Sequence, residues 1–527
     1  MKILVTAIFF SILLTGLSQN GSVFLNNYHN RQVDKVINAS GEIIHTGFKP
    51  LLKDQVGGKI DIDSVLFPDN RDSALLSKIR HTWFLRKLRK EDFFLVDKKD
   101  FKLGANFLVN LESGRDTAID YTPTINTRGI CVYGKVGRNV YFYSDFFENQ
   151  GIFREHINAY VRKYHVIPGF GRTKSYEDKF DYSSSSGFVT YFPWKILSLQ
   201  LGHGKHFVGE GYRSLLLSDN SFFYPYLKIT TTLKKIQYIN LFTSFQEVIA
   251  YDNNYLVHSR KTGSFNYLSY AINKYAQVGL FEGVIFQVAD SAFNKKVPAN
   301  SFNPVIGVRS LQYSLDNTHN VLLGLNLKII PHKSLQLYAQ YVIDDMGKDS
   351  LDKKNGLQAG IKIFDPFGFK NFYLQAEYNK VNPYTYSHLT ARQNYSFYNQ
   401  ALAHPLGANF REFLIISQYN FKDFFIEFRL MNVETGLDSA NLNYGQNIFL
   451  SNNYQMPATA GYEFMQGLKT SITSTGIKFG YMLNPRTNMH FFFGYDKRLS
   501  SNETGKTYSN YIYFGFKTQI YNSSFDF

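Results

Sequence analysis

The chain has 527 residues and a formal net charge of +15, from 57 Lys and Arg against 42 Asp and Glu. Aromatic residues make up 17% of it, with 49 Phe and 38 Tyr but only 2 Trp, which favours strands over helices. A single cysteine, Cys131, excludes an internal disulfide. After residue 18 no uncharged apolar run reaches the roughly 18 residues that a transmembrane helix needs, which excludes a helical membrane protein.

The first residues indicate export. Met1 and Lys2 precede an uncharged apolar stretch, residues 3–17, which fits the central region of a signal peptide and is short for a membrane span. Gly16 and Ser18 offer small residues at the positions that signal peptidase inspects. We therefore expect a signal peptide over residues 1–18, and no lipoprotein processing because no cysteine follows it.

Residues 19–101 form an irregular segment, which we expect to be an N-terminal periplasmic region with one amphipathic helix over residues 72–90. The helix could lie on the inner surface of the membrane or pack against the periplasmic mouth of a barrel. The apolar residues at helical spacing are Leu75, Leu76, Ile79, Trp83, Phe84 and Leu88.

Over residues 102–527 the pattern changes to strict alternation. In residues 424–431, Phe424, Ile426 and Phe428 share one face, while Glu427 and Arg429 share the other. A soluble β-sandwich also alternates, so this pattern alone does not decide the fold class. The same alternation recurs in residues 323–329, 357–363, 372–379 and 489–496.

The connections between these strands favour a membrane barrel, because short periplasmic turns alternate with long external loops in such proteins. At about 22 residues per strand and connection, the segment predicts an all-β, antiparallel up-and-down barrel of about 18 strands. We expect the last strand to end at Phe527. Tight turns near 331–333, 365–370, 420–422 and 484–487 alternate with longer connections near 344–355, 380–409, 432–469 and 497–507.

Such a barrel would be a multi-pass protein of the cell outer membrane, in contact with its lipid and lipopolysaccharide. The aromatic ending of residues 521–527 resembles the signal by which barrel-assembly machinery selects its clients. The net positive charge favours anionic partners such as lipopolysaccharide phosphates or acidic glycans. Because the Lys and Arg residues are scattered, nucleic acid is not an expected partner.

Residues 199–220, LQLGHGKHFVGEGYRSLLLSDN, are unlike ordinary strand sequence. Together with the Tyr224-Pro225 continuation, they resemble a motif of the Wzi-like capsule assembly family of outer-membrane barrels. Residues 337–345 and 398–412 extend the resemblance. It is closest to the Bacteroidota branch of RemB-type gliding motility proteins.

The resemblance implies a non-catalytic barrel that acts as a lectin and anchors capsule or exopolysaccharide, with no cofactor. Motility or adhesin proteins are candidate partners, and adhesion or gliding motility is the expected process. The family places a compact helical bundle at the N-terminus, whereas only residues 72–90 read as a clear helix here. A plugging role for the N-terminal region is therefore an open question.

The glycine-rich stretch 202–211 is predicted to break strand pairing, fold into the lumen and constrict the pore. One interpretation is that nearby polar residues bind glycan; the alternative is a bent strand whose polar groups satisfy one another. The candidate glycan-binding residues are His203, Lys205, His206, Glu210 and Arg213.

Neither a metal nor an enzyme is expected from this stretch. His203 and His206 have no obvious third ligand nearby. Glu210 beside His206, or Asp344 beside Asp345, could be read as an acid–base pair, but adjacent acids at a strand end more often cap a loop or bind a cation. No Gly-x-Ser-x-Gly nucleophile motif supports a hydrolase.

A second candidate glycan-binding set, Tyr384, Tyr386 and Arg392, combines flat aromatic faces with hydrogen-bond donors. The alternative is an aromatic girdle at the level of the lipid headgroups. The competing function is a diffusion or uptake channel of porin type. It rests on the charges expected to face the lumen, which are Lys362, Glu377, Glu427 and Arg429.

Overall fold

The computed structural model describes a barrel and most of its connections. The residues described are 23, 25–52, 56, 60–66, 83–176, 179–250, 256–288, 299–314, 319–344, 353–457, 461–518, 521–522 and 525–527. The expected signal peptide and residues 72–82 of the expected helix lie outside them. Within these ranges, no helix is long and apolar enough to cross a membrane.

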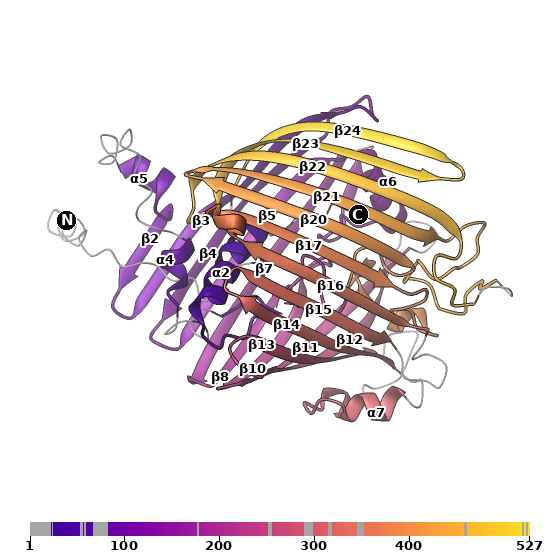
Figure 1. Cartoon of the computed structure of the whole chain (residues 1–527), viewed down its shortest axis with the longest axis horizontal. Coiled ribbons are helices and arrows are strands. Elements are labelled where there is room, and N and C mark those ends of the chain that lie inside the picture. The colour runs from indigo at the N-terminus through magenta and orange to yellow at the C-terminus, as the bar shows by residue number, and fades with distance from the viewer. Residues whose placement is uncertain are drawn as a thin grey trace.

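Eighteen antiparallel strands form one closed barrel (Figure 1), which confirms the predicted fold class. Consecutive strands are neighbours, and β24 pairs with β3 to close the ring, with Lys517 opposite Asn110. The strands are β3 (Phe101–Asp116), β4 (Thr124–Val136), β5 (Val140–Ile152), β7 (Lys179–Trp194), β8 (Leu197–Gly204), β10 (Tyr224–Leu233), β11 (Ile236–Ala250), β12 (Leu256–Ala271), β13 (Ala276–Gln287), β14 (Asn320–His332), β15 (Leu335–Asp344), β16 (Asn355–Phe364), β17 (Phe372–Val381), β20 (Phe410–Phe421), β21 (Phe424–Leu437), β22 (Leu468–Asn484), β23 (Met489–Asn502) and β24 (Gly505–Lys517).

Short elements decorate the barrel. The helices are α2 (Asn27–Ser40), α4 (Ile62–Leu66), α5 (Trp83–Arg89), α6 (Glu155–Tyr164) and α7 (Val308–Ser314), with 3-10 turns η1 (Ala299–Phe302), η2 (Pro366–Gly368) and η3 (Ala391–Gln393). The short strands are β1 (Phe48–Lys49) paired with β9 (Phe207–Val208), β2 (Phe94–Lys98) with β3, β6 (Lys174–Tyr176) with β7, and β18 (Ser396–Phe397) with β19 (Gln400–Ala401).

The described part of the expected helix 72–90 is helix α5. Arg89 donates to the Tyr481 hydroxyl at 3.0 Å, so α5 packs against β22 at the short-turn end of the barrel. Trp83 and Phe84 remain exposed on it, at 58% and 60%. The helix thus combines a contact with the barrel mouth and an apolar surface turned away from the protein.

The alternation of short and long connections is as predicted, with one correction. Residues 234–235, 333–334 and 422–423 are tight turns at one end, and residues 382–409 are a long connection at the other. The expected loop 497–507 is instead a two-residue turn, because β23 and β24 stay paired up to Asn502 and Gly505. Polar residues there belong to strand ends, not to a loop.

The last strand ends at Lys517 and not at Phe527, which is a second correction. Alternation is lost after Lys517, so the chain cannot continue with one apolar face. Phe525 packs against Phe153 with ring centroids 5.4 Å apart, and Phe527 packs against Tyr160 at 5.2 Å. The aromatic ending therefore contacts the protein interior and is not part of the barrel wall.

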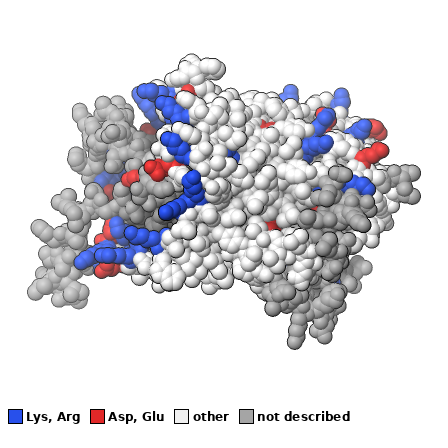
Figure 2. Space-filling model, turned by 60° about the horizontal axis from the view of Figure 1, so that its bottom comes forward, with Lys and Arg blue, Asp and Glu red and all other residues white. Residues whose placement is uncertain are grey.

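The exposed large side chains on the outer face of the wall are mostly apolar. Phe493 and Phe514 are 51% and 63% exposed, whereas Asp496 on the other face of β23 is buried. In Figure 2 the middle of the wall is almost free of charged residues, which gather toward the two ends. This is the pattern of a barrel whose outer face meets lipid.

The alternation of β23 yields a first prediction. Phe493 lies four residues beyond the start of β23, about 10 Å above the short-turn end for a strand tilted by about 40°. Phe493→Lys should destabilise the barrel by about 2–4 kcal/mol, because it places a charge near the middle of the bilayer. Urea titration of the protein folded into phospholipid vesicles measures this.

Ser501→Lys, eight residues further along the same face, is the matched control. It should cost about 0–1 kcal/mol, because Ser501 lies beyond the apolar band. Equal effects of the two substitutions would contradict the assignment of this face to lipid.

Candidate functional site

Part of the N-terminal region occupies the lumen. Residues 25–52, assigned from the sequence to a periplasmic region, lie inside the barrel, where α2 sits at the short-turn end (Figure 1). The Asn26 side chain caps α2 by accepting from the backbone of Tyr28 and His29, and Gly41 ends it at φ 68°. The sequence pattern missed α2 because its apolar strip is narrow: Val33 and Ile37 pack in a small apolar cluster, while its other buried residues are polar.

Ion pairs and hydrogen bonds attach α2 to the wall. Arg31 lies 2.5 Å from Glu427, and Asp34 lies 2.6 Å from Lys362. Asn38 donates to Gln336 at 3.0 Å. These wall residues face the lumen, as predicted for Lys362 and Glu427, but their charges are matched by the N-terminal segment.

The electrostatic state of Asp34 follows from these contacts. Burial acts to raise the pKa of Asp34, but nearby ammonium groups, Lys362 first, outweigh burial and lower the pKa to about 2 from the usual 3.8. Asp34 is therefore a buried carboxylate that stays ionised over almost the whole pH range.

The glycine-rich stretch 202–211 divides after Gly204: residues 202–204 stay paired in β8, and residues 205–223, which we call the glycine-rich segment, fold into the lumen as predicted for 205–211. The chain leaves the wall after Gly204, and β9 pairs with β1, placing Val208 opposite Phe48. Gly209 has φ 132°, a conformation that side chains rarely adopt. Leu215, Leu216 and Leu217 in this segment are fully buried in the main apolar cluster.

Three predicted site residues are buried in this segment with partners inside the protein. Lys205 donates to the carbonyl oxygens of Gly169 at 2.6 Å and Asp219 at 3.2 Å, and burial lowers its pKa to about 8. His206 Nδ1 lies 3.2 Å from the Tyr224 hydroxyl. Glu210 accepts from Thr46 at 2.5 Å, which ties this segment to the N-terminal one.

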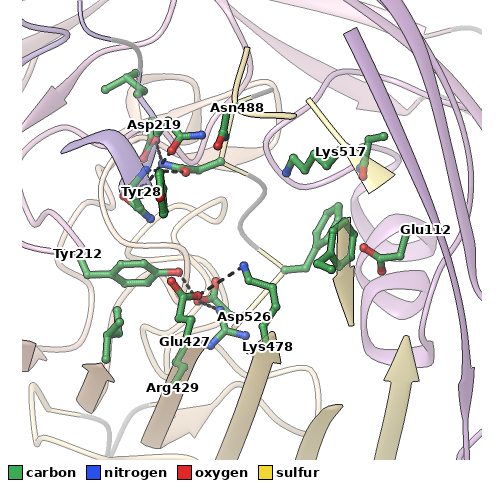
Figure 3. A pocket seen from close by; sticks show the side chains of 18 of the residues that line it. Tyr28, Glu112, Tyr212, Asp219, Glu427, Arg429, Lys478, Asn488, Lys517 and Asp526 are labelled. Atoms are coloured by element: carbon green, nitrogen blue, oxygen red, sulfur yellow. Dashed lines mark hydrogen bonds and ion pairs between the residues drawn. The ribbon is translucent and has the colours of Figure 1, made fainter. Parts of the chain in front are cut away.

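Arg213 is the centre of a larger network. It donates to the Asp526 backbone carbonyl at 2.7 Å and lies 3.3 Å from the Asp526 carboxylate and 3.4 Å from Glu412. Tyr212 donates to Asp526 at 2.7 Å, and Arg429 lies 3.0 Å from it (Figure 3). Asp526 and Glu412 were missed from the sequence, because no local pattern links them to Arg213.

His203 is the exception in the first set. It stays on the wall in β8, half-buried, with Nδ1 2.9 Å from the Ser185 carbonyl oxygen. Most polar groups of the segment have partners elsewhere in the protein, which is close to the alternative interpretation from the sequence, although His206 Nε2 and Arg213 Nε are buried without a hydrogen-bond partner among the described residues. They build a plug and do not present an open surface to a glycan.

The two tyrosines of the second set are also buried. Tyr384 donates to the Asn443 carbonyl oxygen at 2.8 Å, and Tyr386 donates to that of Leu215 at 2.8 Å. Tyr395 donates to Leu216 in the same way at 2.6 Å. Tyr386 and Tyr395 fasten the loop 382–409 to the glycine-rich segment, and Tyr384 fastens it to the loop that contains Asn443, so these tyrosines do not form a headgroup-level girdle. Arg392, in η3, is half-buried.

Asp344, half of the paired acids in the sequence, caps this loop. It accepts from the Tyr386 backbone at 2.6 Å and lies 3.0 Å from Lys354. Asp345 lies outside the described residues. Within the described ranges, no three His, Cys, Asp or Glu side chains gather closely enough to hold a metal ion.

A cavity of about 300 Å³ remains between the plug and the wall. Figure 3 shows Glu427, Arg429 and Lys478 beside Asp526 on one side of it, with Lys517 and Glu112 on the other. Its walls mix positive and negative side chains from α2, the glycine-rich segment and strands β21 to β24. This lining suits water and small polar solutes.

At the long-loop end we define a loop platform, residues 382–409 and 438–457. Asn394 donates to the Leu450 carbonyl oxygen at 2.9 Å, and Ser451 donates to that of Leu389 at 2.7 Å. Leu389 and Tyr454 are 49% and 50% exposed on it. The platform joins an accessible aromatic ring to the half-buried Arg392. Tyr454 was not singled out from the sequence.

No family model matches the chain, and no curated protein matches it in sequence. Among solved structures, Wzi of Escherichia coli, a carbohydrate-binding β-barrel involved in group 1 capsule assembly, aligns over 95% of this chain and 100% of its own, with 12% identity and a TM-score of 0.56. OprD of Pseudomonas aeruginosa aligns over 79% and 94%, with 12% identity and a TM-score of 0.42. OccAB4 of Acinetobacter baumannii aligns over 80% and 99%, with 10% identity and a TM-score of 0.42.

At this identity the likeness to Wzi shows the fold alone. The closed barrel and its mostly apolar outer face place the chain in the outer membrane, which the strands cross many times. The expected branch of gliding motility proteins has no support in these comparisons.

The Asp34–Lys362 pair yields a second prediction. Asp34→Asn should weaken the docking of α2 by about 3–5 kcal/mol at pH 7, because it leaves the buried Lys362 ammonium unpaired. Docking is measured as the anisotropy of a fluorophore on Glu42→Cys, since Cys131 is buried. In the natural chain the depressed pKa of Asp34 adds stability above about pH 4, which is lost as the pH falls toward about 2.

Lys35→Gln provides the matched control. The Lys35 pair with Asp365 lies at the rim and is about one-third exposed, so its loss should cost about 0–1 kcal/mol. An α2 that stays equally immobile in Asp34→Asn would show that the buried pair does not hold the segment.

Proposed function

We propose that this protein is a non-catalytic outer-membrane barrel that holds surface polysaccharide. The observation that carries the proposal is the plug, in which three distant parts of the chain, residues 25–52 with α2, the glycine-rich segment and residues 525–527, are joined to one another and to the wall inside the barrel. A lumen filled in this way favours attachment at the surface over passage through it.

The charges facing the lumen support the same reading. Lys362, Glu427 and Arg429 each pair with a plug residue, and Glu377 accepts from the Tyr212 backbone at 2.7 Å. In an open pore such charges would face water. Here they hold the plug, which removes the main argument for a channel.

The loop platform is the surface that polysaccharide would reach from outside the cell. Tyr454 offers a ring face for a sugar, and Arg392 offers hydrogen-bond donors. Tyr386 and Tyr395 fix the underside of the platform to the plug. A platform held rigidly from below binds with less loss of loop freedom.

The kind of ligand comes from the likeness to Wzi, a carbohydrate-binding barrel of capsule assembly that this chain matches along its whole length. The motif in residues 199–220 supports the same assignment. Adhesion or gliding motility would follow from the retained polysaccharide, with motility or adhesin proteins as further partners. These roles rest on the sequence resemblance alone.

The proposal predicts that the detergent-purified protein binds surface polysaccharide extracted from its own host. The double variant Tyr454→Ala, Arg392→Ala should bind at least about tenfold more weakly, since two hot-spot contacts of this type are each worth about 1 kcal/mol or more. Retention of polymer on a protein-coated biosensor measures the affinity.

Tyr508→Ala is the matched control, because Tyr508 is 56% exposed on the two-stranded end of β23 and β24, away from the platform. It should leave binding unchanged. Failure of the natural chain to bind any host polysaccharide would reject the function. Equal binding by all variants would move the site away from the platform.

A porin-like channel is the second candidate, and the cavity of about 300 Å³ is the observation that favours it. We expect the natural chain to conduct no steady current in planar bilayers, because ion pairs hold the plug in place. Asp34→Asn should raise the frequency of brief openings. Steady conductance by the natural chain would favour the channel over the attachment function.

A further inference from the structure

The connection between β13 and β14 carries a segment that lies outside the barrel. Residues 299–314, which we call the outer cap, contain η1 and α7. Figure 1 shows α7 beyond the wall, at the long-loop end. Unlike the plug segments, the outer cap covers the face of the wall that should meet lipid.

Beneath the outer cap lies a carboxylate on the outer face of the wall. Phe281 and Ile285 of β13 belong to the interior apolar cluster, so Glu282, between them, points outward with Leu280, which is 45% exposed. Glu282 is opposite Asn266 of β12, which is opposite Asn240 of β11. A polar row therefore crosses three adjacent strands of the outer face.

This row lies at membrane depth. Glu282 is six residues beyond the start of β13, about 20 Å along the strand, or about 15 Å in height for a tilt of about 40°. The apolar band of such barrels is about 25 Å tall. A charged side chain facing lipid at this depth is costly unless it is paired.

The outer cap provides the partners. Arg309 lies 2.9 Å from Glu282, the Ser310 hydroxyl and backbone donate to it at 2.6 and 3.0 Å, and Gly307 donates at 3.2 Å. Neither Glu282 nor Arg309 has any exposed surface. The Pro304 carbonyl oxygen accepts from Asn240 at 3.0 Å. Every polar group of the row is thereby satisfied beneath the outer cap.

The exposed side chains of the outer cap are mainly apolar, with Gln312 as an exposed polar residue among them. Phe302 is 45% exposed, Val305 54%, Val308 41% and Leu311 65%. The polar contacts of this segment to the wall are made through Gly307, Arg309 and Ser310, while other hydrogen bonds, such as that from Arg309 to the Ser301 carbonyl oxygen, stay within the segment. A segment with one apolar face and a height within the apolar band is matched by acyl chains and not by water.

We infer that the outer cap is a lipid-inserted element, seated among the acyl chains of the outer leaflet and clasped to the wall by Arg309 and Glu282. The outer leaflet follows from its place at the long-loop end. The outer cap covers the polar row, so lipid contacts the apolar side chains of the outer cap in place of the row. These side chains are Phe302, Val305, Val308 and Leu311. The occupant of this surface is lipid, continuous with the lipid around the rest of the wall.

Quenching by brominated acyl chains tests the inference. The full chain, with Trp83→Phe and Trp194→Phe as a tryptophan-free background, is reconstituted into phosphatidylcholine vesicles with and without brominated chains. We expect the fluorescence of Leu311→Trp to be quenched as strongly as that of Leu280→Trp, a bare lipid-facing position. Thr504→Trp, in the turn between β23 and β24, should show no quenching.

Two results would overturn the inference. If brominated lipid quenches Leu311→Trp no more than Thr504→Trp, the outer cap lies in water. If Leu311→Trp is shielded from the brominated chains and cross-linking also yields dimers, a second copy of the chain covers the outer cap. The Arg309–Glu282 pair is tested separately. Arg309→Met should abolish the quenching of Leu311→Trp, and Glu282→Met in the same chain should restore it. Unchanged quenching in Arg309→Met would reject the clasp.

Discussion

The backbone pairing of β24 with β3 is the contact on which the rest of the molecule depends. Lipid offers no partner for backbone N–H and C=O groups, so a sheet in a membrane must have no free edge. Seven register pairs, from Lys517 opposite Asn110 to Tyr511 opposite Asp116, close the ring. β2 adds to the first part of β3 below them, from Phe94 opposite Ala105 to Lys98 opposite Phe101. The polar interior, the plug and the loops are all consequences of that closure.

A closed wall with apolar residues outside leaves its polar residues inside, and those residues determine what can fill the lumen. An apolar plug would leave the buried charges of Lys362, Glu427 and Arg429 without partners. A polar plug pairs with them, so α2 brings Arg31 and Asp34, and the chain near its last residues brings Asp526. Segments separated by hundreds of residues meet at Arg213 and Glu210 because the closed wall confines them in one lumen.

The barrel could be predicted from the sequence because its period of two is a local property. The alternation of apolar and charged residues in segments such as Phe424 to Glu427 indicates which side chains face lipid and which face the lumen. The lengths of the turns indicate which connections lie at each end of the barrel. The plug could not be predicted in this way. Helix α2 has only a narrow apolar strip, which includes the buried Val33 and Ile37, and it is attached to the wall through charges. The partners of Asp34 and Arg213 lie 328 and 313 residues away. The glycine-rich segment was recognised because glycines interrupt a strand pattern, but its buried side chains looked like ligand contacts. The sequence alone does not distinguish a polar residue that binds a sugar from one that forms a hydrogen bond to the backbone of its own chain.

The fastening of the loop platform to the plug also determines how the molecule responds to mechanical pull. A polymer attached outside the cell draws on its anchor roughly along the barrel axis. The hydroxyls of Tyr386 and Tyr395 pass tension to the backbone of Leu215 and Leu216, and from there to the wall through Gln340, which accepts from the Leu215 backbone at 2.9 Å. In the wall the inter-strand bonds run across the tilted strands, so the component of the pull along the strands loads many of these bonds at once in shear. We expect such an anchor to unfold only when many hydrogen bonds break at the same time, because this direction of pull does not break them one after another.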